Sequence, residues 1–322
     1  GIEPRAGDLP ALRRWFEAQD PADHITRCLQ LAGVQRVYMT NSPFDPQERP
    51  VWEAGVERDP RFVAALRIDP LLVSWSSTAP SLIASGHLPS GELTPANYAG
   101  ARRFLSEWAR RLEARYVMVS LPPSFRYPDG GETATLIREV VVPFCRASGL
   151  PFALMLGVRR AVNPGLQLAG DGVGWADMAS LEALCAENPD VRFLATVLSR
   201  ENQHSLCVAA RKFRNLHAFG CWWFTNVPLV IEEMTRMRLE LLGLSFTPQH
   251  SDARVLDQVV YKWEHSRELI ARALATKYTD LARAGWVASE AEIRRDVQEL
   301  LGGAFERFCG VGGGPSPAPR SA

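Results

Sequence analysis

Residues 96–124 read ANYAGARRFLSEWARRLEARYVMVSLPPS, and this stretch decides the fold class. In its first part, 96–114, apolar residues recur three and four positions apart, which is the pattern of a helix with one buried face. RYVMVSL (115–121) follows as a short and nearly continuous apolar run, typical of a strand with both faces covered. The run ends at once in prolines and a serine. This order predicts a helix–strand unit of an α/β fold.

The same alternation of strand-like and helix-like segments recurs along most of the chain. Helical patterns such as 227–243 lie between the apolar runs, and parallel strands need crossovers of this kind. We predict helices over 255–308 as well. The predicted strands are 36–40, 61–68, 115–121, 152–157, 191–198, 215–221 and 243–247.

Seven strands in this order are one fewer than a (β/α)8 barrel contains. An open doubly wound sheet is the alternative, but no glycine-rich GxGxxG turn follows any of the runs. We therefore predict an α/β fold of the TIM-barrel type, a single domain over 1–310, with its first strand absent from this chain. An unpaired parallel edge leaves backbone donors and acceptors unsatisfied. An upstream segment or a neighbouring chain is therefore expected to fill the gap.

The composition excludes several classes of protein. Thirty-six basic residues balance thirty-six acidic ones among 322, so no net charge directs the chain to nucleic acid or to an anionic membrane. No apolar run reaches the roughly 18 residues that span a bilayer, and the start lacks the apolar segment of a signal peptide. Six cysteines without CxxC spacing indicate reduced thiols in a cytoplasmic protein. The composition of 311–322 predicts a flexible tail.

Polar residues follow the predicted strands directly, and in α/β enzymes the chemistry lies at these strand ends. The last strand runs into LSFTPQHSDAR (244–254), which contains His250 and Asp252. Asp252 could bind a metal ion and accept a proton, or it could cap the helix that follows. His250 shares a side with Asp252 only if the chain is still extended there. A solvent-facing histidine is the alternative.

Taken in order, the strand-end motifs resemble those of the uronate isomerase family of the amidohydrolase superfamily, over most of residues 25–308. This resemblance implies a TIM-type barrel, a divalent metal ion with zinc as the expected ion, and aldose–ketose interconversion of a hexuronate or related sugar acid by proton transfer. The matching segments are TNSPFDP (40–46), RIDP (67–70), LMLGVRR (154–160), GCWWF (220–224) and SDAR (251–254).

Two departures from the family pattern bear on the metal. The sequence contains no His-x-His pair, which in the family supplies two metal ligands from the first strand. Met155 stands where the family has a histidine, and a thioether is a poor ligand for such an ion and carries no proton to transfer. His250 is also off the pattern, and it is a candidate ligand beside Asp252.

The resemblance also implies roles for the basic residues. Arg254 would grip the substrate carboxylate in bidentate fashion, as a guanidinium does. Arg67 and Arg160 are expected to reach the mouth of the barrel, with salt bridges at its rim as the alternative. Asp69 is expected to pair with Arg67.

Aromatic and amide side chains complete the candidate substrate site. Trp222 and Trp223 follow a strand directly, so one indole should face the mouth and the other should pack outward. Asn41 and Asp45 could bind sugar hydroxyls, although SPFDP is also ordinary turn chemistry.

Two other functions stay open on the same barrel. One is a hydrolase or hydro-lyase acting on a small carboxylated substrate, because a fold does not specify a reaction. The other is a degenerate, non-catalytic barrel with a binding or assembly role. The expected partner is a small sugar acid, with no nucleic acid and no membrane, and the chain is expected to form a homo-oligomer.

Overall fold

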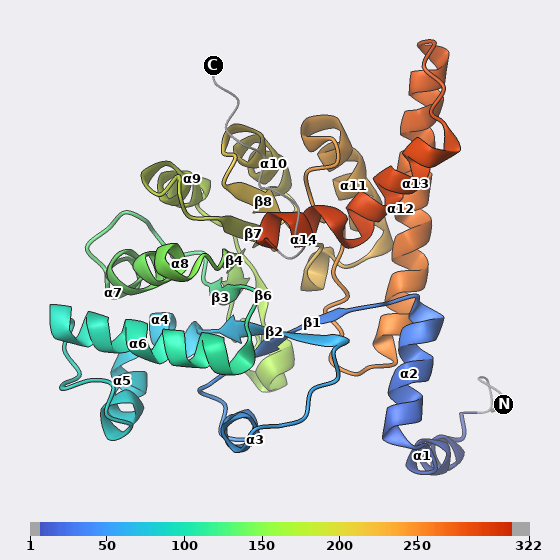
Figure 1. Ribbon diagram of the computed structural model, residues 1–322. Coiled ribbons are helices and arrows are strands. Elements are labelled where there is room, and N and C mark those ends of the chain that lie inside the picture. The colour runs from blue at the N-terminus through green and yellow to red at the C-terminus, as the bar shows by residue number, and fades with distance from the viewer. Residues whose placement is uncertain (1–6, 311–322) are drawn as a thin grey trace.

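A computed structural model describes residues 7–310, apart from the side chain of Leu168. Helices surround a central group of parallel strands (Figure 1). The predicted tail, 311–322, lies outside the described residues.

The strands of the main sheet are all parallel and pair in the order in which they occur along the chain. A sequential order is that of a barrel wall, whereas a doubly wound sheet reverses its order at a switch point. The six strands are β1 (Val37–Asn41), β2 (Phe62–Arg67), β3 (Val117–Leu121), β4 (Phe152–Leu156), β7 (Phe193–Val197) and β8 (Leu216–Ala218).

The predicted seventh strand, 243–247, is corrected by the structure to a single parallel bridge between Phe219 and Thr247. The Thr247 amide donates to Ala218 at 3.0 Å, and the Thr247 carbonyl accepts from Gly220 at 2.8 Å. Pro248 follows immediately, and a proline has no N–H with which to continue the ladder. Within residues 7–310 no strand pairs with the outer edge of β1, so the described part of the barrel is not closed.

A second, two-stranded sheet was not predicted. β5 (Val158–Arg159) and β6 (Gly172–Val173) pair in antiparallel fashion just beyond the end of β4. The 3₁₀ segment Pro164–Gly170 lies between them. This hairpin extends the polar end of β4 toward the mouth of the barrel.

Helices connect and cover the strands, and the predicted helical region 255–308 is formed by the last three. Two π-helical turns, Ile137–Val141 and Glu299–Gly303, join consecutive helices. The helices are α1 (Leu9–Glu17), α2 (Pro21–Ala32), α3 (Glu48–Ala54), α4 (Asp69–Val73), α5 (Trp75–Ala84), α6 (Pro95–Leu112), α7 (Glu132–Leu136), α8 (Val142–Ser148), α9 (Met178–Glu187), α10 (Gln203–Lys212), α11 (Pro228–Leu242), α12 (Gln258–Arg283), α13 (Glu290–Gln298) and α14 (Ala304–Cys309).

The main hydrophobic core lies between the strands and the surrounding helices. Alternate strand residues such as Val119, Phe152 and Phe193 point outward and are fully buried. Phe104 and Leu105 of α6 meet them from the helical layer and are also fully buried. Each such side chain contributes about 1.5–3 kcal/mol by its removal from water. This core explains why the outward face of the strands is apolar, and a smaller inner cluster that includes Met118, Ala153 and Leu194 accounts for the inward face.

Helix α14 closes the amino-terminal end of the strands and lies across the centre of the molecule in Figure 1. Its Phe305 packs against Tyr38 and Tyr116 near the starts of β1 and β3, with ring centroids 4.9 and 6.0 Å apart. The Arg192 guanidinium, just before β7, donates to the Phe308 carbonyl at 2.7 Å. Since this end is filled, the carboxyl-terminal ends of the strands form the open mouth.

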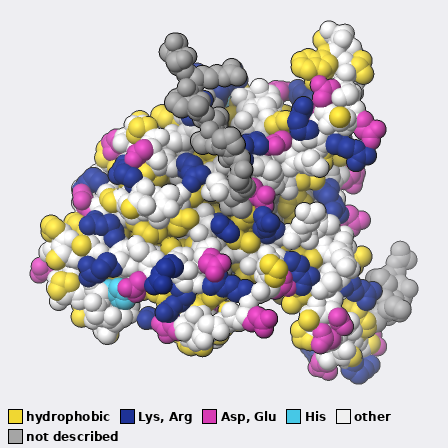
Figure 2. Space-filling model, in the orientation of Figure 1, with side chains coloured by type: hydrophobic (Ala, Val, Ile, Leu, Met, Phe, Trp, Pro, Cys, Tyr) yellow, Lys and Arg dark blue, Asp and Glu magenta, His cyan; other side chains and the backbone are white. Residues whose placement is uncertain are grey.

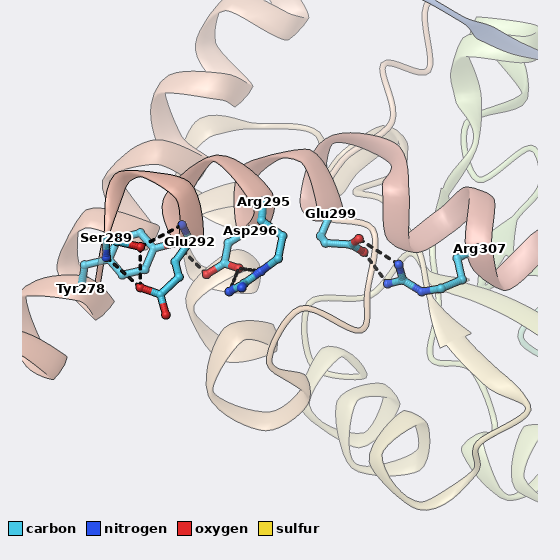
Figure 3. A network of polar contacts seen from close by, with 7 residues as sticks. All are labelled: Tyr278, Ser289, Glu292, Arg295, Asp296, Glu299 and Arg307. Carbon is cyan, nitrogen blue, oxygen red and sulfur yellow. Dashed lines mark hydrogen bonds and ion pairs between the residues drawn. The ribbon is translucent and has the colours of Figure 1, made fainter. Parts of the chain in front are cut away.

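The α12–α13 hairpin projects from the body of the protein and is held by polar contacts (Figure 3). Ser289 and Glu292 form a capping box at the start of α13, and the Tyr278 hydroxyl donates to Asp296 at 3.0 Å. Trp286 lies at the turn between the two helices and is 61% exposed.

On the face shown in Figure 2, cationic and anionic side chains are interspersed. In the described part of the chain, each helix is too short or too polar to cross a membrane.

Candidate active site

Arg67 and Asp69 form a bidentate pair at the carboxyl end of β2. Arg67 Nε donates to Asp69 Oδ2 at 3.0 Å, and Arg67 Nη2 donates to Asp69 Oδ1 at 2.9 Å. The Ser120 amide of β3 also donates to Asp69 Oδ1, at 3.3 Å. The predicted pairing is therefore confirmed. Because Arg67 neighbours the inward-facing Met118 in register, the guanidinium is held at the inner side of the mouth.

Three inward-facing residues lie side by side at one level of the barrel. Ser120, Met155 and Thr196 are register partners on β3, β4 and β7. The Thr196 hydroxyl is buried and has no hydrogen-bond partner. Met155, at the position where the family pattern has a histidine, contacts both the inner core and the cluster around Trp222. At this level the wall offers two hydroxyls and a thioether.

The two tryptophans pack on one cluster, and this corrects the prediction that they point in opposite directions. Trp222 is buried with Val158 and Leu198 at the strand ends, and Trp223 packs against the same group. Their ring centroids are 6.2 Å apart. Alternation fails because Trp223 has a φ of 48°, in the left-handed region, and begins a 3₁₀ turn. Met155 packs against the same cluster as Trp222, beyond the end of β4.

A buried glutamine holds the segment that carries His250 and Asp252. Gln249 is 2% exposed, and its side chain accepts from the Cys221 amide at 3.2 Å. It also donates to Asn226 at 2.8 Å. Asn226 in turn donates to the carbonyls of His250 and Ser251, at 3.3 and 2.9 Å. Side-chain hydrogen bonds thus replace the strand ladder that ends at Thr247.

The half-buried His250 side chain lies against the backbone of Gly220, and its Nε2 atom is buried. A Cβ atom at Gly220 would lie 1.6 Å from His250 Cδ2 and 2.2 Å from Nε2, so the ring occupies the space that only a glycine leaves. Burial lowers the pKa of His250 to about 4, and the negative charge of Asp252 opposes this shift in part. His250 is therefore neutral at pH 7.

Asp252 has a left-handed backbone, with a φ of 46°, between the last strand segment and α12. Its carbonyl accepts from the Lys262 ammonium at 2.8 Å. Burial lowers the pKa of Lys262, while the Asp252 charge raises it. Lys262 was not predicted as a site residue. The signal that could have found it is a cationic residue on the predicted helix that directly follows Asp252 and Arg254.

The donors around Asp252 form an incomplete zinc site in the described residues. Imidazole and carboxylate are suitable donors, and His250 Nε2 is buried without a hydrogen-bond partner. That atom faces Gly220, however, and within residues 7–310 no third His, Cys, Asp or Glu groups its ligand atom with those of His250 and Asp252. Two ligands are fewer than the three that catalytic zinc sites use.

Arg160 pairs with the carboxylate of Asp171, a residue that was not predicted. The Arg160 guanidinium forms an ion pair with Asp171, whose side chain is 5% exposed. Hydrogen bonds from the Ala161 amide and from Arg160 lower the pKa of Asp171, and the positive charge of Arg254 adds to this. The β5–β6 hairpin therefore brings one predicted arginine, Arg160, to an anion, with the charge of Arg254 acting from farther away. No local pattern around Asp171 signalled this contact.

Asn41 and Asp45 follow β1 and make turn contacts. Asn41 Nδ2 donates to Glu48 at 3.1 Å, while its Oδ1 atom is buried without a partner. Asp45 accepts from the amides of Gln47 and Glu48 at 2.8 and 2.9 Å, and these bonds lower its pKa. Asp45 thus caps the start of α3. Contact with a substrate remains a prediction for both residues.

A cavity of about 420 Å³ lies apart from these strand ends. It is lined by Met39 and Phe62 of the first two strands and by Val51 and Trp52 of α3. Met39 and Phe62 alternate with the inward-facing Tyr38 and Val63, so the cavity lies on the outer side of the barrel wall.

Comparison with known proteins extends this description. No protein-family model matches the chain, and no curated protein sequence matches it. Among solved structures, a uronate isomerase from Bacillus halodurans is 47% identical with a TM-score of 0.93, and the match covers 96% of this chain and 74% of that one. A uronate isomerase from Thermotoga maritima matches with a TM-score of 0.67 at 16% identity, over 88% of this chain and 69% of that one. A glucuronate isomerase from Caulobacter crescentus has a TM-score of 0.67 at 13% identity, over 91% and 68%.

The sequential parallel strands, the surrounding helices and the acidic and basic residues at the strand ends define a protein of the TIM-barrel class. The two more distant structures share this fold. The identity of 47% over most of both chains goes further and confirms the resemblance carried by the strand-end motifs. The chain belongs to the uronate isomerase family.

Proposed function

We propose that this chain is an isomerase that interconverts the aldose and ketose forms of a hexuronate or a related sugar acid. The observation that carries the proposal is the 47% identity to a uronate isomerase over 96% of the chain. The residue types at the strand ends support it, since the reaction needs a group that moves a proton and cations that hold a carboxylate.

Asp252 is the proposed proton carrier. Aldose–ketose interconversion removes a proton from the carbon next to the aldehyde and returns one to the aldehyde carbon, while a hydroxyl proton moves between the two oxygens. No atom is gained or lost. Met155 stands at the position where the family has a histidine. It cannot take part in the proton transfer because a thioether carries no exchangeable proton. One carboxylate would therefore take the carbon-bound proton and return it.

Arg254 and Arg160 are the proposed binding site for the substrate carboxylate. Arg160 already pairs with the Asp171 carboxylate, and the positive charge of Arg254 favours an anion in the same region. Arg67, fixed by Asp69, would bind a further substrate oxygen from the opposite part of the wall. Trp222 would cover the sugar and keep water from the reacting carbons.

A divalent ion, with zinc as the expected ion and Asp252 and His250 as the donors, remains a prediction. We also propose that the protein works in the cytoplasm or another reducing compartment. All six cysteines are buried and unpaired, which supports this proposal. Assembly into a homo-oligomer is likewise retained as a prediction.

Incubation of the purified protein with glucuronate and with galacturonate tests the reaction. We expect ketose formation from at least one acid, followed by a colorimetric ketose assay or by NMR. In deuterated water, ¹H NMR should also show how much solvent deuterium enters the carbon-bound position. A folded protein that forms no ketose from either acid would contradict the proposed reaction.

Exchange of Arg254 for lysine tests the proposed carboxylate clamp. Lysine keeps the charge but loses the planar fork, so KM for the sugar acid should rise about 10–100-fold while kcat changes only a few-fold. Arg283→Lys is the matched control, because Arg283 lies at the far end of α12 with its side chain 77% exposed. An Arg254→Lys enzyme with the KM of the wild type would contradict this role.

A further inference from the structure

A group of three metal-ligating side chains lies between α2 and the start of α12. His24 and Cys28 are one turn apart on α2, and Asp257 directly precedes α12. His24 Nε2 lies 3.0 Å from Asp257 Oδ1, and Cys28 Sγ lies 3.5 Å from His24 Nε2 and 3.9 Å from Asp257 Oδ1. The group shares no residue with the proposed active site and plays no part in the reaction described above.

One of these spacings, Cys28 to His24, equals an edge of a zinc coordination tetrahedron, and the other two differ from such an edge by about 0.3 Å. Bonds of about 2.3 Å to sulfur and about 2.0–2.2 Å to nitrogen and oxygen, at tetrahedral angles, place the ligand atoms about 3.3–3.6 Å apart. A set of one thiolate, one imidazole and one carboxylate suits Zn²⁺, whereas Mg²⁺ and Ca²⁺ prefer oxygen alone. The three atoms are therefore close to the arrangement that zinc requires.

Asp257 occupies the N-cap position of α12 but does not cap that helix with its side chain. Its carboxylate turns to His24 and Cys28 instead, and it is 45% exposed. Cys28 is 3% exposed, and the His24 side chain is 15% exposed, with Trp15 and Phe16 of α1 beside its ring. Two ligands are thus held by the packing, and the third leaves an opening to solvent.

We infer that His24, Cys28 and Asp257 form a structural Zn²⁺ site, with a water molecule as the fourth ligand. Burial and the charge of Asp257 raise the pKa of the Cys28 thiol, so without a cation the thiol keeps its proton. On binding, the thiol proton leaves to solvent and the imidazole proton shifts from Nε2 to Nδ1, so that one proton is released for each ion.

The site would fasten the segment that carries the proposed active-site residues. Asp257 lies three residues after Arg254 and five after Asp252. Farther along the same two helices, Arg267 Nη1 of α12 donates to the Ala32 carbonyl of α2 at 2.7 Å. A zinc ion at Asp257 would provide a second link between α2 and α12. It would lie at the start of α12, directly beside the mouth of the barrel.

Titration with Co²⁺, a spectroscopic substitute for Zn²⁺, tests the site in the full chain after removal of metal with a chelator. We expect one equivalent to give a thiolate-to-cobalt charge-transfer band in the near ultraviolet and the visible absorption of tetrahedral cobalt. Cys28→Ser should abolish the charge-transfer band. Asp257→Asn should weaken Co²⁺ binding at least 10-fold, and this variant should fold because the carboxylate is half exposed.

Two control variants distinguish Co²⁺ binding at this site from Co²⁺ binding elsewhere on the protein. Asp280→Asn removes another exposed carboxylate of α12 and should leave the titration unchanged. Asp252→Asn should also keep the thiolate band, because Asp252 belongs to the other proposed ligand set. A wild-type protein without a thiolate band, or a band of unchanged affinity in Asp257→Asn, would overturn the inference. Loss of sugar-acid turnover with the band intact would instead count only against the proposed isomerase activity.

Discussion

Replacement of Asp252 by asparagine is expected to lower kcat for sugar-acid isomerisation by about 10²–10⁴-fold, the usual contribution of a positioned acid–base group. An amide cannot take the proton from carbon, and Met155 at the neighbouring strand end cannot replace it. KM should change only a few-fold, because Arg254 and Arg160 still bind the substrate carboxylate. Steady-state ketose formation at saturating substrate measures the effect.

The choice of asparagine matters because Asp252 has a φ of 46°. Asparagine adopts this left-handed region more readily than most residues, so the backbone should stay as it is. The melting temperature of the variant should therefore remain near that of the wild type, which separates lost chemistry from lost folding. Asp280→Asn, on the exposed side of α12, should keep full activity. A kcat that survives in Asp252→Asn would remove this residue from the proposed mechanism.

The sequence predicted best those features that depend on neighbouring residues. The alternation of apolar runs with helical periodicity is local. Five predicted runs contain strands of the sheet, and the run 36–40 ends one residue before β1 does, at Asn41. The pairing of Arg67 with Asp69 is local too, because two positions separate them across the end of β2. Such patterns arise from the regular periodicity of helices and strands, so they can be recognised in a single sequence.

Other features depend on contacts between distant segments. The β5–β6 hairpin has two residues in each strand, too few for any periodic signal. It brings Asp171 to Arg160, and no local pattern in the sequence predicts that contact. The segment 243–247 reads as a strand, yet Pro248 and the side chain of Gln249 replace the ladder beyond Thr247. These contacts follow from tertiary packing, which overrides local preference.

Substitution of Gly220 by alanine is expected to lower the free energy of unfolding by about 2–5 kcal/mol. Two costs combine: a left-handed φ of 68° disfavours any residue with a Cβ by about 1–2 kcal/mol, and overpacking of a buried site costs about 1–3 kcal/mol more. The new methyl group would lie 1.6 Å from Cδ2 of the His250 ring. Chemical denaturation of the variant beside the wild type measures the loss.

A double substitution separates the two costs. In the His250→Ala background the imidazole is gone, so Gly220→Ala, measured against His250→Ala alone, should lose the overpacking term of about 1–3 kcal/mol and keep only the backbone term. Gly149→Ala is the matched control for that term, because Gly149 has a φ of 70° and a Cβ there would meet no atom within 4 Å. It should cost about 1–2 kcal/mol. If Gly220→Ala costs no more than Gly149→Ala, the His250 ring does not rest on Gly220 in solution. The strand end would then be free to present this imidazole to the mouth, and His250 would become a stronger candidate ligand beside Asp252.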